Sequence, residues 1–317
     1  MSHCQRRISA RKGHMVALAL MALAACAPTP VMQRPMAPPP RIDAPPPVAS
    51  AESQAMRAYY ANVQSDLLAQ GLMRTDGGGQ DAPFTDRMLA ENFIRVALFD
   101  EYQHSGAGLV ARETVSRLRR WEVPVRVGLH FGASVPPERR AIDTAQVSSY
   151  LARMARLTGH PIALADSASN FQIYIVNEDE RRALGPVIAA TLPDLAPMDV
   201  AGLTNLPRST YCIVYALSKG NSAAYTRAFA VIRAEHPDLL RLSCMHEEIA
   251  QGLGLANDSP TARPSIFNDD EEYALLTRQD ELMLRLLYSP SLRPGMSEPE
   301  ARPIIFSLAS MLMAGAS

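Results

Sequence analysis

The sequence lacks the short motifs by which several large enzyme classes are identified. It contains no G-x-S-x-G nucleophile elbow, no phosphate-binding P-loop and no complete dinucleotide-binding fingerprint. Three consecutive glycines follow Asp76, but this segment is too short and wrongly placed to cradle phosphates. The sequence therefore gives no support to a serine hydrolase of the nucleophile-elbow type, or to a P-loop or Rossmann nucleotide-binding protein.

Lysine is scarce outside the first 25 positions, where acidic side chains outnumber basic ones. The chain has 31 basic and 32 acidic side chains, and four of the basic ones lie in an initial segment that has no acid: Arg6, Arg7, Arg11 and Lys12. The remainder is mildly acidic, and Lys219 is its only lysine. We therefore expect no nucleic-acid partner, because an acidic protein has no electrostatic attraction for phosphates. No apolar run beyond residue 25 reaches the ~20 residues needed to span a bilayer.

The first 25 residues have the pattern of a bacterial export signal. A polar, basic segment precedes the short apolar run Met15–Ala25, which has about the length of a signal-peptide core. The run ends in Leu23-Ala24-Ala25-Cys26, which resembles the lipobox of bacterial lipoproteins. The resemblance implies cleavage before Cys26 and attachment to a membrane through acyl chains on that cysteine. An ordinary signal peptide with an incidental cysteine is the alternative.

Residues 26–50 are expected to comprise the lipidated cysteine and a proline-rich linker. Nine of the 24 positions from 27 to 50 are proline, which disfavours helices and sheet ladders and favours polyproline II. At about 3.1 Å per residue, the linker could hold the next domain up to ~75 Å from the membrane. Because Ala27 rather than an aspartate follows Cys26, the lipoprotein resemblance implies an envelope location on the outer membrane, facing the periplasm, rather than on the inner membrane.

Two cysteines, Cys212 and Cys244, remain after the lipobox. An even number of cysteines in an oxidising compartment predicts a disulfide between them, and two buried thiols are the alternative. The sequence has no C-x-x-C motif, which argues against a zinc ribbon or a thioredoxin-like role.

The hydrophobic periodicity predicts a mixed α/β domain. Helices are expected over residues 51–73, 85–102, 109–118, 142–157, 184–191, 223–235, 242–255 and 277–288. Strands are expected over 123–131, 162–165, 171–176 and 211–217, with a loop from 192 to 209. This order favours an α/β or α+β sandwich. After residue 50, the chain is expected to divide into an N-terminal helical region (51–119), a sheet-containing domain (120–290) and a C-terminal tail (291–317).

The segment from His246 to Asp258 holds the densest group of chemically capable side chains. Read from His246, it begins like the zinc-binding motif H-E-x-x-H, but Ala250 stands where the second histidine is needed. Shifted by one residue, the positions of H-E-x-x-H-x-x-G-x-x-H are occupied by Glu247, Glu248, Gln251, Gly254 and Asn257. In that register the segment resembles the metzincin branch of zinc metallopeptidases, with Glu247 and Gln251 in place of the two helix histidines.

The flanking segments extend this resemblance. Ser265–Asn268 stands where metzincins have a methionine-containing turn, residues 276–288 look like the closing helix, and residues 121–131 look like the opening strand. The resemblance implies a zincin-like sheet-and-helix sandwich over residues 120–290. It requires the strands predicted at 123–131 and 211–217 to lie in one sheet behind the helix that carries Glu248.

A second resemblance covers most of the chain. It rests on E-E-x-x-Q-x-L-G-L-x-N-D from Glu247, S-I-F-N-D from Ser265, L-R-P-G-M from Leu292, and the segments 76–79, 83–85 and 100–102. These motifs resemble a domain-of-unknown-function family of bacterial envelope lipoproteins, which implies no particular activity.

The side chains at the metzincin positions change the expected chemistry. Glu247, Gln251 and either Asn257 or Asp258 would offer oxygen ligands, which suit calcium, magnesium or manganese better than zinc. We therefore expect no zinc and leave open a divalent metal as the cofactor. Glu248 occupies the general-base position, but a glutamate is a poor hydrolase without a metal to activate water.

Three hypotheses follow for this segment. In the leading one, the domain has lost catalysis and binds a protein or cell-wall partner. In the second, it is a metallohydrolase with an oxygen-rich metal site and Glu248 as general base. In the third, Glu247, Glu248 and Gln251 are structural residues that are solvated or cap the helix. His246 is interpreted as an ordinary helix residue rather than a proton shuttle.

Overall fold

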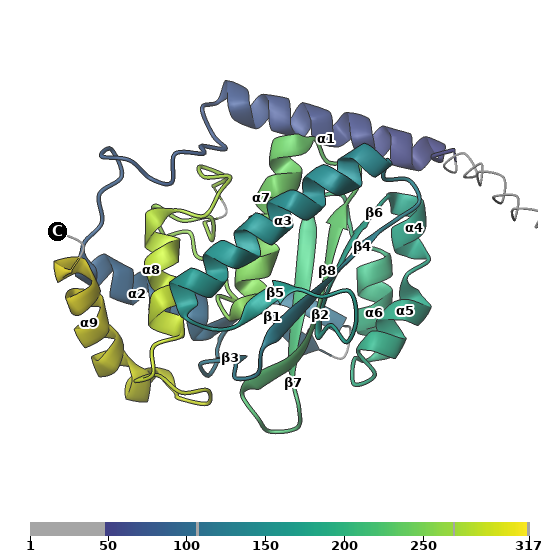
Figure 1. The fold of residues 1–317 in the computed structure, drawn as a ribbon. Coiled ribbons are helices and arrows are strands. Elements are labelled where there is room, and N and C mark those ends of the chain that lie inside the picture. The colour runs from purple at the N-terminus through teal and green to yellow at the C-terminus, as the bar shows by residue number, and fades with distance from the viewer. Residues whose placement is uncertain (1–47, 106–107, 269, 316–317) are drawn as a thin grey trace, which may run out of the picture. The chain divides into compact units, whose positions relative to one another are not determined.

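A mostly parallel sheet with helices on both faces organises the protein (Figure 1). The computed structural model describes residues 48–105, 108–268 and 270–315. Their helices are α1 (Ala51–Ala69), α2 (Asp86–Ala97), α3 (Pro137–Thr158), α4 (Glu178–Arg182), α5 (Gly185–Thr191), α6 (Pro197–Thr204), α7 (Asp238–Leu253), α8 (Arg278–Leu287) and α9 (Glu298–Ala314). Their strands are β1 (Phe99–Ser105), β2 (Gly108–Val115), β3 (Arg120–Trp121), β4 (Val125–Phe131), β5 (Ile162–Leu164), β6 (Phe171–Val176), β7 (Cys212–Ser218) and β8 (Ala224–Arg233).

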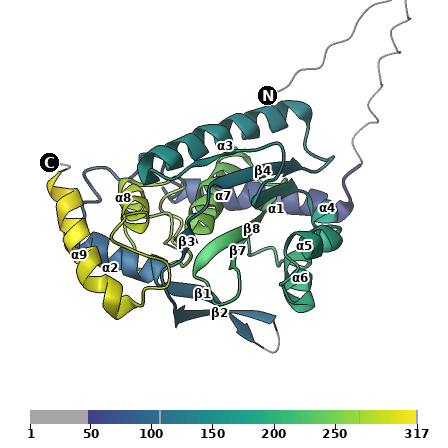
Figure 2. The same ribbon diagram turned by 60° about the horizontal axis from the view of Figure 1, so that its bottom comes forward.

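The main sheet has the strand order β3–β8–β6–β4–β5. Strand β7 pairs with β8 along the edge that faces away from β6. All pairings are parallel except that of β7 with β8, which is antiparallel. The remaining two strands, β1 and β2, form a separate antiparallel hairpin. Figure 2 shows this hairpin on the side of the sheet where β7 lies.

Strand β8 explains why the sheet has a core on each face. Ala228, Ala230 and Ile232 are buried in the larger core, to which α3, α7 and α8 contribute. Phe229 and Val231 alternate with them and are buried in a smaller core, to which α5 and α6 contribute. A strand that is covered on both faces has apolar residues at every position, and this accounts for the continuous apolar run in β8.

Helix α7 approaches the sheet closely because glycine occupies its contact point. A Cβ atom added to Gly252 would lie 2.5 Å from Cζ of Phe171 on β6. The indole nitrogen of Trp121 donates a hydrogen bond of 2.8 Å to the carbonyl oxygen of the same glycine. The helix ends at Gly254, whose φ of 129° is unfavourable for residues with a side chain. Together these contacts fix both the height of α7 above the sheet and the point where the chain leaves it.

The predicted mixed α/β class is confirmed, and the predicted helices over 142–157 and 277–288 correspond to α3 and α8. Several segment predictions are wrong. Residues 223–235, predicted as a helix, form the central strand β8, because burial on both faces outweighs the helix propensity of alanine. Residues 109–118 were predicted as a helix, but their greater part forms β2 of the hairpin. The helix predicted over 85–102 ends at Ala97, and β1 begins at Phe99.

Two segments contain more regular structure than the sequence indicated. The predicted loop from 192 to 209 includes α6, which starts at Pro197. The predicted tail from 291 includes α9, which packs against α2 and buries Ala301, Ile305 and Ala309 in the larger core. Apolar residues spaced by four positions indicate a helix. Pro303 lies within this segment, and a proline in the interior of a segment argues against a helix there.

The predicted signal peptide, Cys26 and nearly all of the predicted linker lie outside the described residues. Within the part that is described, no helix is both long enough and apolar enough to cross a membrane.

The contact between α7 and the sheet can be tested by adding one methyl group. We expect Gly252→Ala to lower the free energy of unfolding by about 1–3 kcal/mol, because the new Cβ overlaps the ring of Phe171. The measurement is urea denaturation followed by circular dichroism. The matched control is Gly202→Ala in α6, where no atom lies within 4 Å of the new Cβ. This control should raise stability by about 0.5–1 kcal/mol. Equal stability changes for the two variants would contradict the close contact.

Candidate functional site

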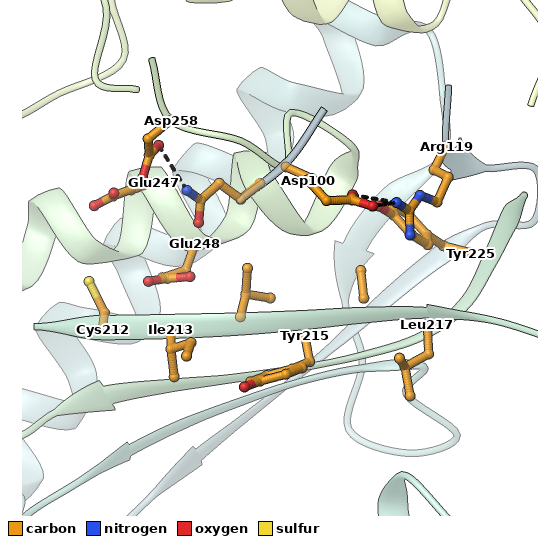
Figure 3. A pocket seen from close by; sticks show the side chains of 14 residues that line it. Asp100, Arg119, Cys212, Ile213, Tyr215, Leu217, Tyr225, Glu247, Glu248 and Asp258 are labelled. Carbon is orange, nitrogen blue, oxygen red and sulfur yellow. Dashed lines mark hydrogen bonds and ion pairs between the residues drawn. The ribbon is translucent and has the colours of Figure 1, made fainter. Parts of the chain in front are cut away.

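A cavity of about 220 Å³ lies between α7 and β7 (Figure 3). Six consecutive residues of β7, from Cys212 to Leu217, line one wall. The opposite wall is formed by Glu247, Glu248 and Gln251 of α7, followed by Ala256 and Asp258. Asp100, Arg119 and Tyr225 complete the lining. We call this cavity the α7–β7 cleft.

Strand β7 presents its edge to the cleft. Among the described residues, β7 pairs with β8 alone, so its other edge carries backbone groups without a neighbouring strand. Figure 3 shows the side chains of Ile213, Tyr215 and Leu217 on the side of the strand away from α7. Side chains of successive strand residues point to opposite faces of a sheet. Since six consecutive residues of β7 line the cleft, the backbone of the strand is part of the cleft wall.

The polar face of α7 supplies carboxylates to the cleft. Glu248 is buried with 3% of its surface exposed, and in Figure 3 its carboxylate points toward β7. Gln251, one turn further on, is also buried and donates a hydrogen bond of 3.1 Å from Nε2 to Oδ1 of Asp258. This bond is possible because the helix ends at Gly254 and the chain turns back along it.

An ion pair occupies the other end of the cleft. Nη2 of Arg119 contacts both carboxylate oxygens of Asp100 and the hydroxyl of Ser116. Burial disfavours the charged form of Arg119, but Tyr225 and Asp100 outweigh it, and the pKa of Arg119 is raised. Burial raises the pKa of Tyr225. Arg119 is therefore a permanent cation, paired with Asp100, at this end of the cleft.

The predicted disulfide between Cys212 and Cys244 is confirmed. It joins the first residue of β7 to α7, with the two Cα atoms 5.9 Å apart, and Cys212 lines the cleft. The bond therefore holds the two walls together at one end.

The structure brings together four of the five predicted metal or catalytic residues, namely Glu247, Glu248, Gln251 and Asp258. Asn257 points elsewhere: its amide nitrogen donates to the carbonyl oxygen of Arg95 at 3.0 Å, and only 1% of its surface is exposed. Asn257 thus fastens the end of the α7 loop to α2. Over residues 48–105, 108–268 and 270–315, no group of three or more histidine, cysteine, aspartate or glutamate side chains is arranged to hold a metal.

His246 lies outside the cleft. Its ring stacks on Tyr150 of α3 with the centroids 4.0 Å apart, and its Nδ1 accepts a hydrogen bond from the backbone nitrogen of Leu276. Burial lowers its pKa to about 3, so the ring is neutral at physiological pH. These contacts give His246 a packing role between α3, α7 and the loop before α8.

The S-I-F-N segment also has a structural partner. The carboxylate of Asp280 in α8 is fully buried and accepts hydrogen bonds from the Ser265 hydroxyl, the Ile266 nitrogen and the nitrogen and hydroxyl of Thr277. Burial raises the pKa of Asp280 to about 6. The motif therefore closes the loop between α7 and α8 around one carboxyl group.

The sequence contains no signal that places Arg119 and Tyr225 in the cleft, and Asp100 stands out only as part of a family motif. They lie on or beside β1, β3 and β8, far from α7 in the chain, and no spacing rule links them to Glu248. The parallel pairing of β3 with β8, which places Trp121 beside Tyr225, brings this end of the cleft together.

Comparison with known proteins identifies a family for this chain. The model of a family described as protein of unknown function (DUF2927) matches residues 86–307, which include all the residues that line the cleft. Neither the curated proteins nor the solved structures yielded a match.

The disulfide is expected to contribute strongly to stability because it closes a loop of 32 residues. Chain-entropy arguments give about 3.7 kcal/mol for a loop of that size. We expect reduction with dithiothreitol to lower the free energy of unfolding by about this amount in urea denaturation. The variant in which Cys212 and Cys244 are both serine should start at the lower value and show no response to the reductant. An unchanged unfolding midpoint on reduction would contradict this role.

Proposed function

Because the chain belongs to the DUF2927 family, whose description assigns no activity, we propose a function from the α7–β7 cleft itself. The protein is a cell-envelope lipoprotein that binds an extended, amine-bearing peptide in this cleft without catalysing a reaction. The peptide belongs to a protein or cell-wall partner in the periplasm.

The observation that carries this proposal is the open edge of β7. An edge strand offers a row of backbone donors and acceptors that an extended peptide satisfies by adding one more strand. The cleft is aligned with six consecutive residues of this strand, so a bound peptide would run beside β7 and under α7. Main-chain hydrogen bonds give affinity in this mode, and pockets for side chains give specificity.

The charges around the cleft favour a cationic ligand. Among the described residues, its lining includes the acids Asp100, Glu247, Glu248 and Asp258 and the base Arg119. Arg119 forms an ion pair with Asp100 at one end of the cleft. A carboxylate in a buried setting binds a ligand amine through charge-assisted hydrogen bonds.

The metzincin resemblance supports the same function. The strands that it requires in one sheet, β4 and β7, both belong to the sheet against which α7 packs. In this interpretation the domain keeps a peptidase-like cleft, while Glu247 and Gln251 replace the histidines that would bind zinc. Binding without cleavage is the expected result of that replacement.

Peptide binding can be tested with ligands as long as β7. We expect a fluorescent seven-residue peptide of alternating valine and lysine to bind the full chain, and the valine–glutamate counterpart to bind far more weakly. Glu248→Gln should lower the affinity for the lysine peptide by about tenfold, because the acceptor of the hydrogen bond from the ligand amine loses its charge. The measurement is fluorescence anisotropy at fixed ionic strength.

Glu138→Gln is the matched control, since Glu138 is an exposed acid at the start of α3 outside the cleft. This variant should keep the affinity of the wild-type protein. Equal binding of the two peptides, or equal weakening by both variants, would count against recognition in the cleft.

A metallohydrolase with Glu248 as general base is the second candidate. It is favoured by the presence of Glu247, Glu248, Gln251 and Asp258 around one cavity. The binding assay separates the two functions when it is repeated with manganese or calcium. Metal-dependent cleavage of the lysine peptide, detected by mass spectrometry and lost in Glu248→Gln, would favour the hydrolase.

The lipid anchor can be tested directly in cells. We expect Cys26→Ser to abolish incorporation of an alkyne-labelled fatty acid and to release the protein from the outer-membrane fraction, because Cys26 is the proposed acylation site. Cys4→Ser is the control and should keep both the label and the location. Retention of label in Cys26→Ser would refute the lipoprotein assignment.

A further inference from the structure

The two halves of the Cys212–Cys244 disulfide differ in their access to the α7–β7 cleft. Cys212 is half-buried and lines the cleft, whereas Cys244 lies within the larger core with 1% of its surface exposed. Figure 3 shows the sulfur of Cys212 on the side of β7 that faces α7. Access is one of the factors that decide which sulfur of a disulfide a thiolate attacks. A thiol that enters the cleft therefore meets Cys212.

The buried half of the disulfide has a hydrogen-bond donor beside it. Nδ1 of His236 lies 3.7 Å from Sγ of Cys244. Burial lowers the pKa of His236 well below its ordinary value, and Arg233 and Arg241 lower it further, so the ring is neutral and carries one proton. Because a disulfide sulfur has no proton and can only accept, this contact places the proton on Nδ1. His236 thus donates to the sulfur that the cleft does not expose.

These two differences give thiol–disulfide exchange a direction. We propose that the α7–β7 cleft captures a thiol-bearing ligand as a mixed disulfide on Cys212, with Cys244 as the leaving sulfur. The capture is covalent and does not require strand addition to β7. It therefore goes beyond the non-covalent binding proposed above.

The exchange balances in atoms and electrons. The ligand thiol releases its proton to solvent, and the resulting thiolate attacks Sγ of Cys212. A sulfur–sulfur bond forms between the ligand and Cys212, the bond to Cys244 breaks, and Cys244 leaves with the electron pair as a thiolate. One thiol and one disulfide are present before and after the step, so neither an oxidant nor a reductant is consumed. Attack of Cys244 on Cys212 reverses the step and expels the ligand.

His236 stabilises the leaving sulfur. A hydrogen bond to a charged acceptor is stronger than one to a neutral acceptor, so the bond from Nδ1 strengthens as Cys244 becomes a thiolate. A thiol that leaves more easily speeds the exchange. The contact therefore favours departure of Cys244, and with it attack on Cys212.

The return reaction makes the capture selective. Cys244 remains on α7 close to Cys212, so it competes with any ligand for the sulfur of Cys212. A thiol with no other contact in the cleft is soon expelled. A ligand that the cleft also holds non-covalently keeps its thiol at a high effective concentration and is retained. Stable capture thus requires both a thiol and a fit to the cleft.

The site of attack can be tested without any substitution. The full chain is incubated with a large excess of cysteamine, quenched with acid, alkylated, digested and mapped by mass spectrometry. We expect cysteamine on Cys212 to exceed cysteamine on Cys244 by about tenfold or more, with the alkyl label on Cys244. The same reaction in urea is the control and should give comparable amounts on both cysteines. Equal amounts in the folded chain, or exchange in urea alone, would overturn the proposal.

The donor to Cys244 can be tested with a pair of variants. His236→Leu should slow the attack of cysteamine on Cys212 by about tenfold or more, because the leaving thiolate loses a charge-assisted hydrogen bond. His236→Asn is the matched variant, since its amide nitrogen restores a donor near the position of Nδ1 and should restore most of the rate. Both variants lose the ring contact with Tyr60, so they share any loss of packing. Equal slowing in both would contradict the role of the donor.

This test and the peptide-binding test fail separately. The valine–lysine peptide carries no thiol, and cysteamine is too short to add a strand to β7. Loss of peptide binding with exchange intact would therefore refute the proposed function alone, and the reverse result would refute the capture of thiols alone.

Discussion

The close packing of α7 against the sheet is the constraint on which the rest of the structure depends. Gly252 allows the approach, Trp121 anchors the helix through a carbonyl oxygen, and the disulfide ties its middle to the start of β7. Because these three contacts set the position of α7, they also set the width of the α7–β7 cleft. The carboxylate of Glu248 is therefore held at a fixed height above the strand, which is the preorganisation that selective binding needs.

A buried ionic network fixes the other wall. Arg233 at the end of β8 pairs with Glu178 and donates to the carbonyl oxygens of Leu206, Pro207 and Thr210. These carbonyls belong to the segment that enters β7. Burial alone would raise the pKa of Glu178, but Arg181 and Arg233 outweigh it and hold the pKa below its ordinary value. Buried ion pairs add little net stability, yet they define one geometry, and here that geometry determines where β7 begins.

The sequence predicted local features well and the meeting of distant ones poorly. Residues 142–157 have a helical period of apolar positions, and Phe171–Val176 is a short apolar run; both predictions hold in α3 and β6. The segment at 223–235 was mistaken for a helix because its alanines favour helix and its strand is apolar on both faces. The burial of both faces of this strand follows only from its place in the strand order of the sheet. The same limit applies to the cleft, where the α7 residues were found by motif, while Asp100 and Arg119 depend on long-range pairing.

The open edge of β7 also needs protection from unintended pairing with other chains. A short strand with charged groups beside it is the usual way to prevent aggregation at a sheet edge. Here β7 has seven residues and lies under the acids of α7, while the disulfide fixes one of its ends. A strand from another protein must therefore fit beneath α7 before it can pair with β7. Under the proposed function, the features that protect the edge are thus the ones that would make its binding selective.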